Sequence, residues 1–126
     1  ITSNFDVVAN KKLSVESRYP LPTMIGKGYV GTILSHQFYC DLNYLVLEGL
    51  YMGIPVIHNS EACKEAGYFY STFDSADCVR AIKESIANHD QKIEEYKKSA
   101  SEVLYKFSAK NEENIKNYKY LIENIS

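Results

Sequence analysis

The segment 42–58 constrains the fold of this chain more than any other part of its sequence. Residues 42–52 are apolar on almost every side, which predicts a helix that is buried against a sheet. Gly53 is placed to end this helix as its C-cap, and the apolar run 54–58 predicts a strand with Pro55 near its start, where proline is tolerated. The segment therefore indicates a helix that leads directly into a strand.

The same two kinds of signal, short β-rich runs and apolar stripes of helical spacing, continue on both sides of this segment. Before residue 42 we expect strands at 5–9, 12–17 and 29–35, with a loop or short helix after residues 19–22. After the helix and strand of 42–58 we expect a short helix from Ser60 to Gly67, a strand at 68–70, and a helix that is capped by Asp74 and carries Val79, Ile82 and Ile86 on one face. The chain then continues with two amphipathic helices, whose apolar stripes are Ile93, Tyr96, Ala100, Val103, Leu104, Phe107 and Ile115, Tyr118, Ile122, Ile125. This alternation predicts an α/β fold with a parallel sheet flanked by helices, because right-handed strand–helix–strand units join parallel neighbours.

The final helix is expected to begin at Asn111, an N-cap residue that is followed by Glu112 and Glu113 in the first turn. Its apolar stripe needs a partner, because helices of this length are marginal alone. We expect it to fold onto its own domain beside the helix 93–107, since the connection 108–110 is short and short connections favour antiparallel neighbours.

The charge balance argues against nucleic acid and anionic membranes as partners. Fourteen Lys and Arg stand against 16 Asp and Glu, a net charge of −2, and arginine occurs only as Arg18 and Arg80. No apolar run reaches the roughly 18 residues of a membrane-spanning helix. The three cysteines form no CxxC pair, which fits a reducing compartment, so a cytoplasmic location is expected.

Two polar loops carry the candidate ligand-binding residues. Ligands of parallel α/β sheets bind beyond the carboxyl ends of the strands, and loops 35–43 and 58–60 are both expected there, each before a helix N-terminus. Because such an N-terminus attracts anions, a phosphorylated ligand is expected. The sequence has no Walker A motif and no metal-ligand spacing, so no metal is expected. The candidates in these loops are His36, Asp41, Asn43, His58 and Asn59.

Three candidate residues also have a structural alternative. Glu48 interrupts an otherwise apolar helix, and a buried carboxylate without a partner is costly, so Glu48 either faces a polar pocket or is paired inside the fold. His36 and His58 are either ligand-binding residues or rings that satisfy backbone groups at the ends of strands. The sequence leaves these alternatives open.

Residues 42–57 resemble the donor-site signature of the GT-B glycosyltransferases; they read Leu-Asn-Tyr-Leu-Val-Leu-Glu-Gly-Leu-Tyr-Met-Gly-Ile-Pro-Val-Ile. The signature consists of Glu, seven residues and Glu, followed by Ala-x-Ala-x-Gly-x-Pro-Val-Ile. Over roughly residues 30–108 the chain is also similar to a poorly characterised bacterial and viral group of glycosyltransferase-like proteins, and the His-Asn-Ser continuation at 58–60 adds to this likeness.

The resemblance implies that the chain binds a nucleotide-sugar donor. Glu48 corresponds to the Glu that holds the ribose hydroxyls, and Leu42 and Asn43 correspond to the Phe-Gly pair whose backbone meets the diphosphate. Cys40 stands where the family has its first Glu, which is a departure, because a thiol does not accept sugar hydroxyls as a carboxylate does. Asp41, one residue later, is the candidate for part of that role.

As a function, the resemblance implies transfer of a sugar from a nucleotide diphosphate sugar to an acceptor, with no metal required. It implies that residues 1–126 form a single Rossmann-like domain whose partner, a missing N-terminal domain, holds the acceptor, and that residues 109–126 are a candidate crossing helix. Two alternatives stay open. One is a flavodoxin-like or receiver-like module, and the other is a non-catalytic glycosyltransferase-like domain, which the departure at Cys40 favours.

Overall fold

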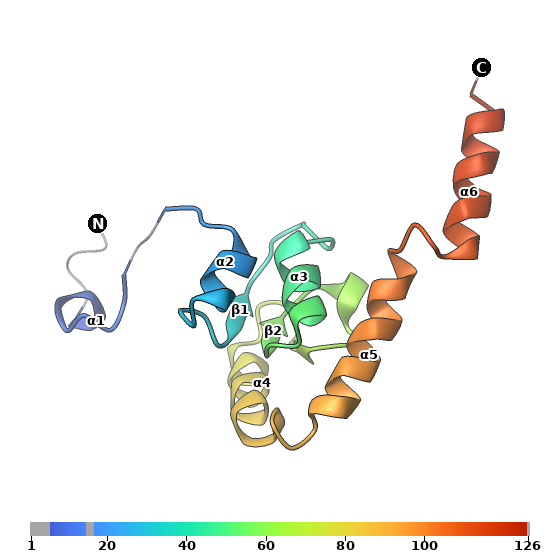
Figure 1. The fold of residues 1–126 in the computed structure, drawn as a ribbon. Helices are drawn as coiled ribbons and strands as arrows, with labels where there is room; N and C mark the ends of the chain where they lie inside the picture. The colour runs from blue at the N-terminus through green and yellow to red at the C-terminus, as the bar shows by residue number, and fades with distance from the viewer. Residues whose placement is uncertain (1–5, 15–16, 126) are drawn as a thin grey trace.

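A computed structural model describes residues 6–14 and 17–125 and shows an α/β chain built around a small parallel sheet (Figure 1). Strands β1 (Ile33–Ser35), β2 (Val56–His58) and β3 (Tyr68–Phe69) lie side by side in that order. Both neighbouring pairs are parallel, with Leu34 beside Ile57 and Ile57 beside Tyr68. The predicted parallel α/β architecture is therefore confirmed, although the strands are shorter than expected.

Two helices precede the strands along the chain, and the others connect the strands or follow them. They are α1 (Asp6–Ala9), α2 (Leu21–Gly26), α3 (Tyr44–Met52), the 3-10 helix η2 (Glu61–Cys63), α4 (Ser75–Asn88), α5 (Ile93–Lys106) and α6 (Glu112–Glu123). Helix α3 packs over one face of the sheet with α5 beside it, and α4 packs along β2 and β3 on the other face. Within the described residues, no helix is long and apolar enough to cross a membrane.

Gly49 brings α3 unusually close to the sheet. A Cβ at this position would lie 2.6 Å from Cγ2 of Val56 and 2.7 Å from Cδ1 of Ile33. The helix then ends at Gly53, whose φ of 71° is the left-handed conformation typical of a C-cap glycine. The predicted sequence of helix, glycine cap and strand over 42–58 is thus confirmed, with the helix beginning at Tyr44.

The N-terminal strands predicted at 5–9 and 12–17 are not found among the described residues. Residues 6–9 form the short helix α1, and residues 12–14 are irregular; Phe5 and residues 15–16 lie outside the described part of the chain. Short apolar runs suit either a helix or a strand, and α1 buries no side chain that would decide between them. The prediction at 5–9 is therefore wrong.

Two apolar stretches are less buried than their sequence suggested. Of the run 29–35 only the last three residues form β1, and Leu34 at the edge of the sheet is 57% exposed. In α4, Val79 and Ile86 are exposed, while the small side chains of Ala81 and Ser85 face the sheet. Helix α4 packs through these small residues and through Ile82, which is partly buried against the core.

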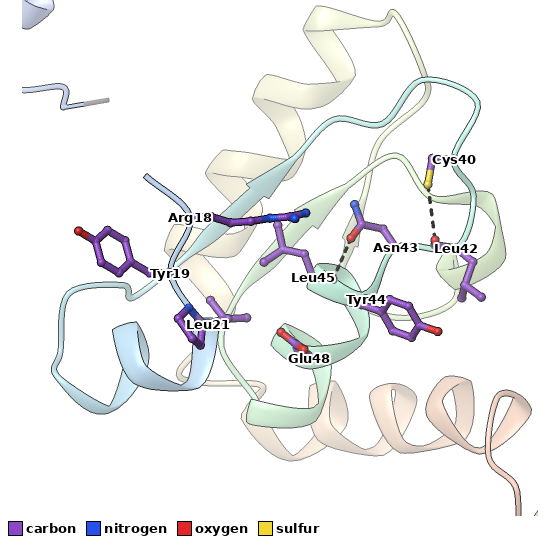
Figure 2. Close-up of a pocket in the computed structure, with 10 residues that line it drawn as sticks. Arg18, Tyr19, Leu21, Cys40, Leu42, Asn43, Tyr44, Leu45 and Glu48 are labelled. Atoms are coloured by element: carbon purple, nitrogen blue, oxygen red, sulfur yellow. Dashed lines mark hydrogen bonds between the residues drawn. The ribbon is translucent and has the colours of Figure 1, made fainter. Parts of the chain in front are cut away.

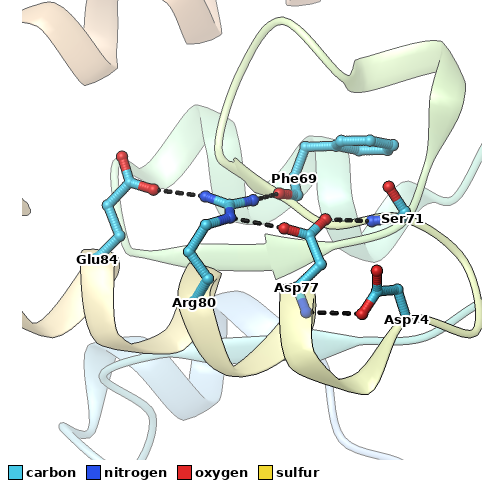
Figure 3. A network of polar contacts seen from close by, with 6 residues as sticks. All are labelled: Phe69, Ser71, Asp74, Asp77, Arg80 and Glu84. Carbon is cyan, nitrogen blue, oxygen red and sulfur yellow. Dashed lines mark hydrogen bonds and ion pairs between the residues drawn. The ribbon is translucent and has the colours of Figure 1, made fainter.

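A polar network ties the start of α4 to the end of β3 (Figure 3). Asp77 accepts hydrogen bonds from the backbone N–H of Ser71 at 2.8 Å and from Nε of Arg80 at 2.6 Å. Arg80 also donates to the carbonyl of Phe69 and pairs with Glu84, both at 2.8 Å. Its hydrogen bond to Asp77 lowers the pKa of that carboxyl. The network fixes the loop 70–74 between β3 and α4.

Helix α6 does not pack on the domain as predicted. Asn111 caps it, accepting a hydrogen bond from the N–H of Glu113 at 2.9 Å, as the sequence indicated. However, α6 buries none of its residues, and Figure 1 shows it pointing away from the sheet beyond α5. The short connection after α5 bends the chain outward and does not return it along that helix. The expectation of antiparallel packing is therefore wrong.

We expect the amide hydrogens of α6 to exchange with solvent much faster than those of α5. Both helices are amphipathic, but α5 buries Tyr96, Ala100 and Val103, whereas α6 has no buried side chain to protect it. Hydrogen–deuterium exchange followed by mass spectrometry measures both helices in one sample. Protection of 112–123 equal to that of α5 at low protein concentration would contradict this arrangement.

Candidate functional site

A cleft of 780 Å³ lies at the N-terminal half of α3, between that helix and the segment that precedes α2 (Figure 2). Helix α3 begins at the carboxyl edge of the sheet, because it follows β1 through the loop 36–43. This is the edge at which parallel α/β sheets bind their ligands. The cleft is lined by Arg18, Tyr19, Pro20, Leu21, Cys40, Leu42, Asn43, Tyr44, Leu45 and Glu48.

Glu48 lines this cleft and is exposed to solvent. Helix α3 buries Val46, Gly49 and Leu50 against the sheet and α5, while the side that carries Glu48 stays open. The predicted burial of α3 against the sheet is therefore confirmed, whereas the explanation of Glu48 as an acid paired inside the fold is wrong. Its carboxylate is free of any burial cost and accessible to a ligand.

Asn43 caps α3 and lies on the same wall of the cleft. Its Oδ1 accepts a hydrogen bond from the N–H of Leu45 at 2.8 Å, which satisfies one of the open donors at the helix start. An anion that bound this N–H would have to displace the amide oxygen. The Nδ2 group, in contrast, keeps donor hydrogens that a ligand oxygen could accept.

Cys40 and Leu42 complete this wall. The Cys40 thiol is exposed and lies 3.5 Å from the carbonyl oxygen of Leu42, as donor to acceptor. The side chain of Leu42 is also exposed and forms an apolar rim. Cys40 lies at the border of a second, smaller cleft, which it shares with Asp41.

His58 lies in the core, with its ring fully buried at 0% exposure. Its Nε2 donates to the carbonyl oxygen of Ala66 at 2.8 Å, and its Nδ1 accepts from the N–H of Ser60 at 3.2 Å. A ring with one donating and one accepting nitrogen is neutral, and burial lowers the pKa of His58 accordingly. His58 is therefore a ring that satisfies backbone groups at the end of a strand, and it does not line the cleft.

Asn59 is also buried and holds the loop after β1 in place. Its side chain accepts from the N–H of Gln37 and donates to the carbonyl oxygen of Gln37, both at 2.8 Å, and it donates to Oγ1 of Thr72 at 3.0 Å. Beside it, Ser60 Oγ donates to the carbonyl oxygen of Asp41. The two loops therefore touch, but Asn59 acts within the protein and does not line the cleft of Glu48.

His36 and Asp41 lie on the far side of the same loop. The ring of His36 is exposed, and its Nδ1 is 2.9 Å from the hydroxyl of Tyr70, on whose ring it stacks. It lines an apolar cleft of 520 Å³ beside α4. The exposed Asp41 lines the smaller cleft next to Cys40. Neither residue shares the cleft with Glu48.

Arg18 and Tyr19 are the site residues that sequence reasoning missed. They come before the prolines at the start of α2, a stretch that the sequence marked only as a break between elements. In Figure 2 the guanidinium of Arg18 extends over the cleft past Leu45 toward Asn43. The only signal in the sequence that could have pointed to Arg18 as a site residue is the rarity of arginine in this chain.

The model of a family described as "Protein of unknown function (DUF2827)" matches residues 1–122. The chain belongs to this family. No curated protein and no solved structure matches it.

The cleft of this DUF2827 chain combines three kinds of chemistry. Arg18 supplies a cation, Glu48 supplies a pair of acceptor oxygens, and Tyr19 and Tyr44 supply aromatic surface. A ligand that carries phosphate, hydroxyl and planar ring groups matches all three. Among the described residues of the DUF2827 chain, no group of three His, Cys, Asp or Glu side chains is arranged to hold a metal ion.

Proposed function

We propose that this DUF2827 chain is the nucleotide-sugar-binding part of a glycosyltransferase, built on a Rossmann-like half of a GT-B fold. The observation that carries the proposal is the convergence of Glu48, Asn43 and Arg18 on one cleft at the carboxyl edge of a parallel sheet. The first two residues belong to the segment that resembles the donor-site signature, and Arg18 adds the cation that the segment lacks.

Each part of the donor has a partner in this proposal. Glu48 accepts hydrogen bonds from the two ribose hydroxyls, since its exposed carboxylate offers two oxygens on one side of α3. Arg18 and the Nδ2 group of Asn43, at the start of α3, hold the diphosphate, because a guanidinium and an amide N–H both donate to phosphate oxygens. Tyr19 or Tyr44 stacks on the base, and both rings border the cleft.

The reaction would break the bond between the anomeric carbon and the diphosphate and form a bond from that carbon to an acceptor oxygen. The nucleotide diphosphate leaves with additional negative charge, which Arg18 and the positive end of α3 offset. The acceptor and the group that takes its proton belong, in this proposal, to a second domain. None of the roles given to this chain's residues needs a metal ion.

A second candidate is a non-catalytic domain of the same ancestry, and Cys40 favours it. At the position where the glycosyltransferase signature has a carboxylate, the exposed Cys40 thiol lies against the carbonyl of Leu42. A thiol in this place binds sugar hydroxyls weakly, so the chain would bind a nucleotide without activating a sugar. Nucleotide binding without transfer to any acceptor, measured on a chain that includes both domains, would favour this candidate.

Glu48→Gln should weaken the binding of a nucleoside diphosphate by about 1–3 kcal/mol, the range for the loss of charge-assisted hydrogen bonds. Isothermal titration with UDP, ADP and GDP measures the change and also identifies the preferred base. Glu102→Gln is the matched control, because Glu102 is an exposed acid on α5 outside the cleft. Equal affinities for Glu48→Gln and the unaltered chain, with the fold intact, would remove Glu48 from the site.

A further inference from the structure

Three aromatic side chains form an exposed cluster at the carboxyl edge of the sheet, next to the cleft of Glu48. We call Phe38, Tyr39 and Phe73 the aromatic shelf. The rings of Phe38 and Tyr39 meet edge to face with centroids 4.3 Å apart, and Phe38 meets Phe73 in the same way at 5.6 Å. This geometry leaves ring faces open to solvent, and all three side chains are exposed.

Two of these rings sit on residues with a strained backbone conformation. Tyr39 has a φ of 54° and Phe73 a φ of 64°, a left-handed conformation that bulky side chains rarely adopt. Their side chains are 93% and 74% exposed, so packing in the core does not offset this strain. Strain that gives no gain in folding is typical of positions that serve binding.

The shelf borders a cleft of 320 Å³ whose other wall is polar. Asp41 and Glu61 offer carboxylate oxygens, and Gln37 and Thr72 offer groups that both donate and accept hydrogen bonds. No Lys or Arg lines this cleft, which argues against a phosphate ligand here. Cys40 lines both this cleft and that of Glu48, so the two are neighbours.

We propose that the shelf and its polar cleft bind a neutral saccharide. The hydrogens on the C–H face of a pyranose ring are partially positive and pack against the negative face of an aromatic ring. Its hydroxyl groups donate to the carboxylates of Asp41 and Glu61 and exchange hydrogen bonds with Gln37. The saccharide is either free or the sugar of a nucleotide-linked donor, and only the second case rests on the proposed function.

The test follows the ring signals of the shelf by NMR on the full chain. The probes are maltotriose, cellotriose, chitotriose, and the UDP, ADP and GDP conjugates of glucose beside UDP, ADP and GDP alone. Shifts with a trisaccharide assign the shelf to a free saccharide. Shifts with a nucleotide glucose, but with neither the matching nucleotide nor a trisaccharide, assign it to the sugar of the donor.

Tyr39→Gly should lower the affinity for the bound probe about tenfold, the size expected for one aromatic contact. Glycine suits the φ of 54°, so this variant removes the ring without harming the fold. Tyr39→Phe should keep the affinity, because the ring face and not the hydroxyl makes the contact. Tyr29→Ala, which removes another exposed ring, is the control and should bind as the unaltered chain does.

Three results would overturn the proposal: no probe shifts the shelf, Tyr39→Gly binds unchanged, or the ring signals respond only to protein concentration and so report contact between copies. Its failure is separate from failure of the proposed function. Nucleotide binding that depends on Glu48, without any effect of sugars on the shelf, would reject only the saccharide site. Trisaccharide binding without nucleotide binding would reject only the nucleotide site.

Discussion

Gly67→Ala is expected to lower the free energy of unfolding by about 2–5 kcal/mol. Gly67 has a φ of 71°, where any side chain adds strain. A Cβ there would also lie 2.8 Å from Nε2 of the buried His58 and 2.9 Å from the carbonyl oxygen of Val56. Neither neighbour can move easily, because one is a fully buried ring and the other is backbone of the central strand.

Gly28→Ala separates the two contributions. Gly28 has the same φ of 71°, but no atom lies within 4 Å of its Cβ position. Its alanine variant therefore adds only the conformational cost, about 1–2 kcal/mol. Urea unfolding of both variants measures the difference. Equal losses in the two variants would show that crowding around Gly67 contributes nothing.

His58→Leu is expected to cost about 2–4 kcal/mol at pH 8, because two buried backbone groups lose their partner. The carbonyl of Ala66 and the N–H of Ser60 both bond to the ring, and leucine of similar size can bond to neither. His36→Leu is the control for the loss of a histidine, since the ring of His36 is exposed and its removal should change stability far less.

The cost of His58→Leu should shrink as the pH falls. Burial lowers the pKa of His58 below 6.5, so under acidic conditions the unfolded chain takes up a proton that the folded chain excludes. The unaltered chain therefore loses stability as the pH drops below about 6.5, whereas the leucine variant lacks this contribution. Urea unfolding at pH 8, 6 and 5 measures both chains, and a constant difference between them would contradict a neutral, buried His58.

The predictable parts of this fold carry local signals. Gly53, Asp74 and Asn111 mark helix ends in the sequence, and each acts as the cap expected of it. Caps depend on a few neighbouring backbone groups, so short stretches of sequence suffice to find them. The order of strands and helices from residue 33 onward follows from the same local patterns.

The surroundings of Glu48, His58 and Arg18 in the fold could not be predicted in this way. Whether Glu48 is buried depends on which side of α3 the sheet and α5 cover, and the nearly uniform apolar pattern of that helix does not reveal this. His58 becomes a core residue through its contact with Ala66, eight residues away. Arg18 reaches the cleft because the chain before α2 passes beside α3, a tertiary contact without a local signal.

The loop 37–41 is a shared wall, and this has a thermodynamic consequence. Hydrogen bonds attach this loop to the residues after β2 at two points: Asn59 bonds to Gln37, and Ser60 bonds to Asp41. Cys40, within the loop, borders both the cleft of Glu48 and the cleft of the aromatic shelf. A ligand that shifts this wall from one side changes the shape offered to a ligand on the other. Linkage then requires reciprocity: whatever factor a saccharide applies to nucleotide affinity, the nucleotide applies to saccharide affinity. Substitution of Ser60, which lines neither cleft, would remove one of the two attachments of this loop and so weaken the coupling without touching either ligand.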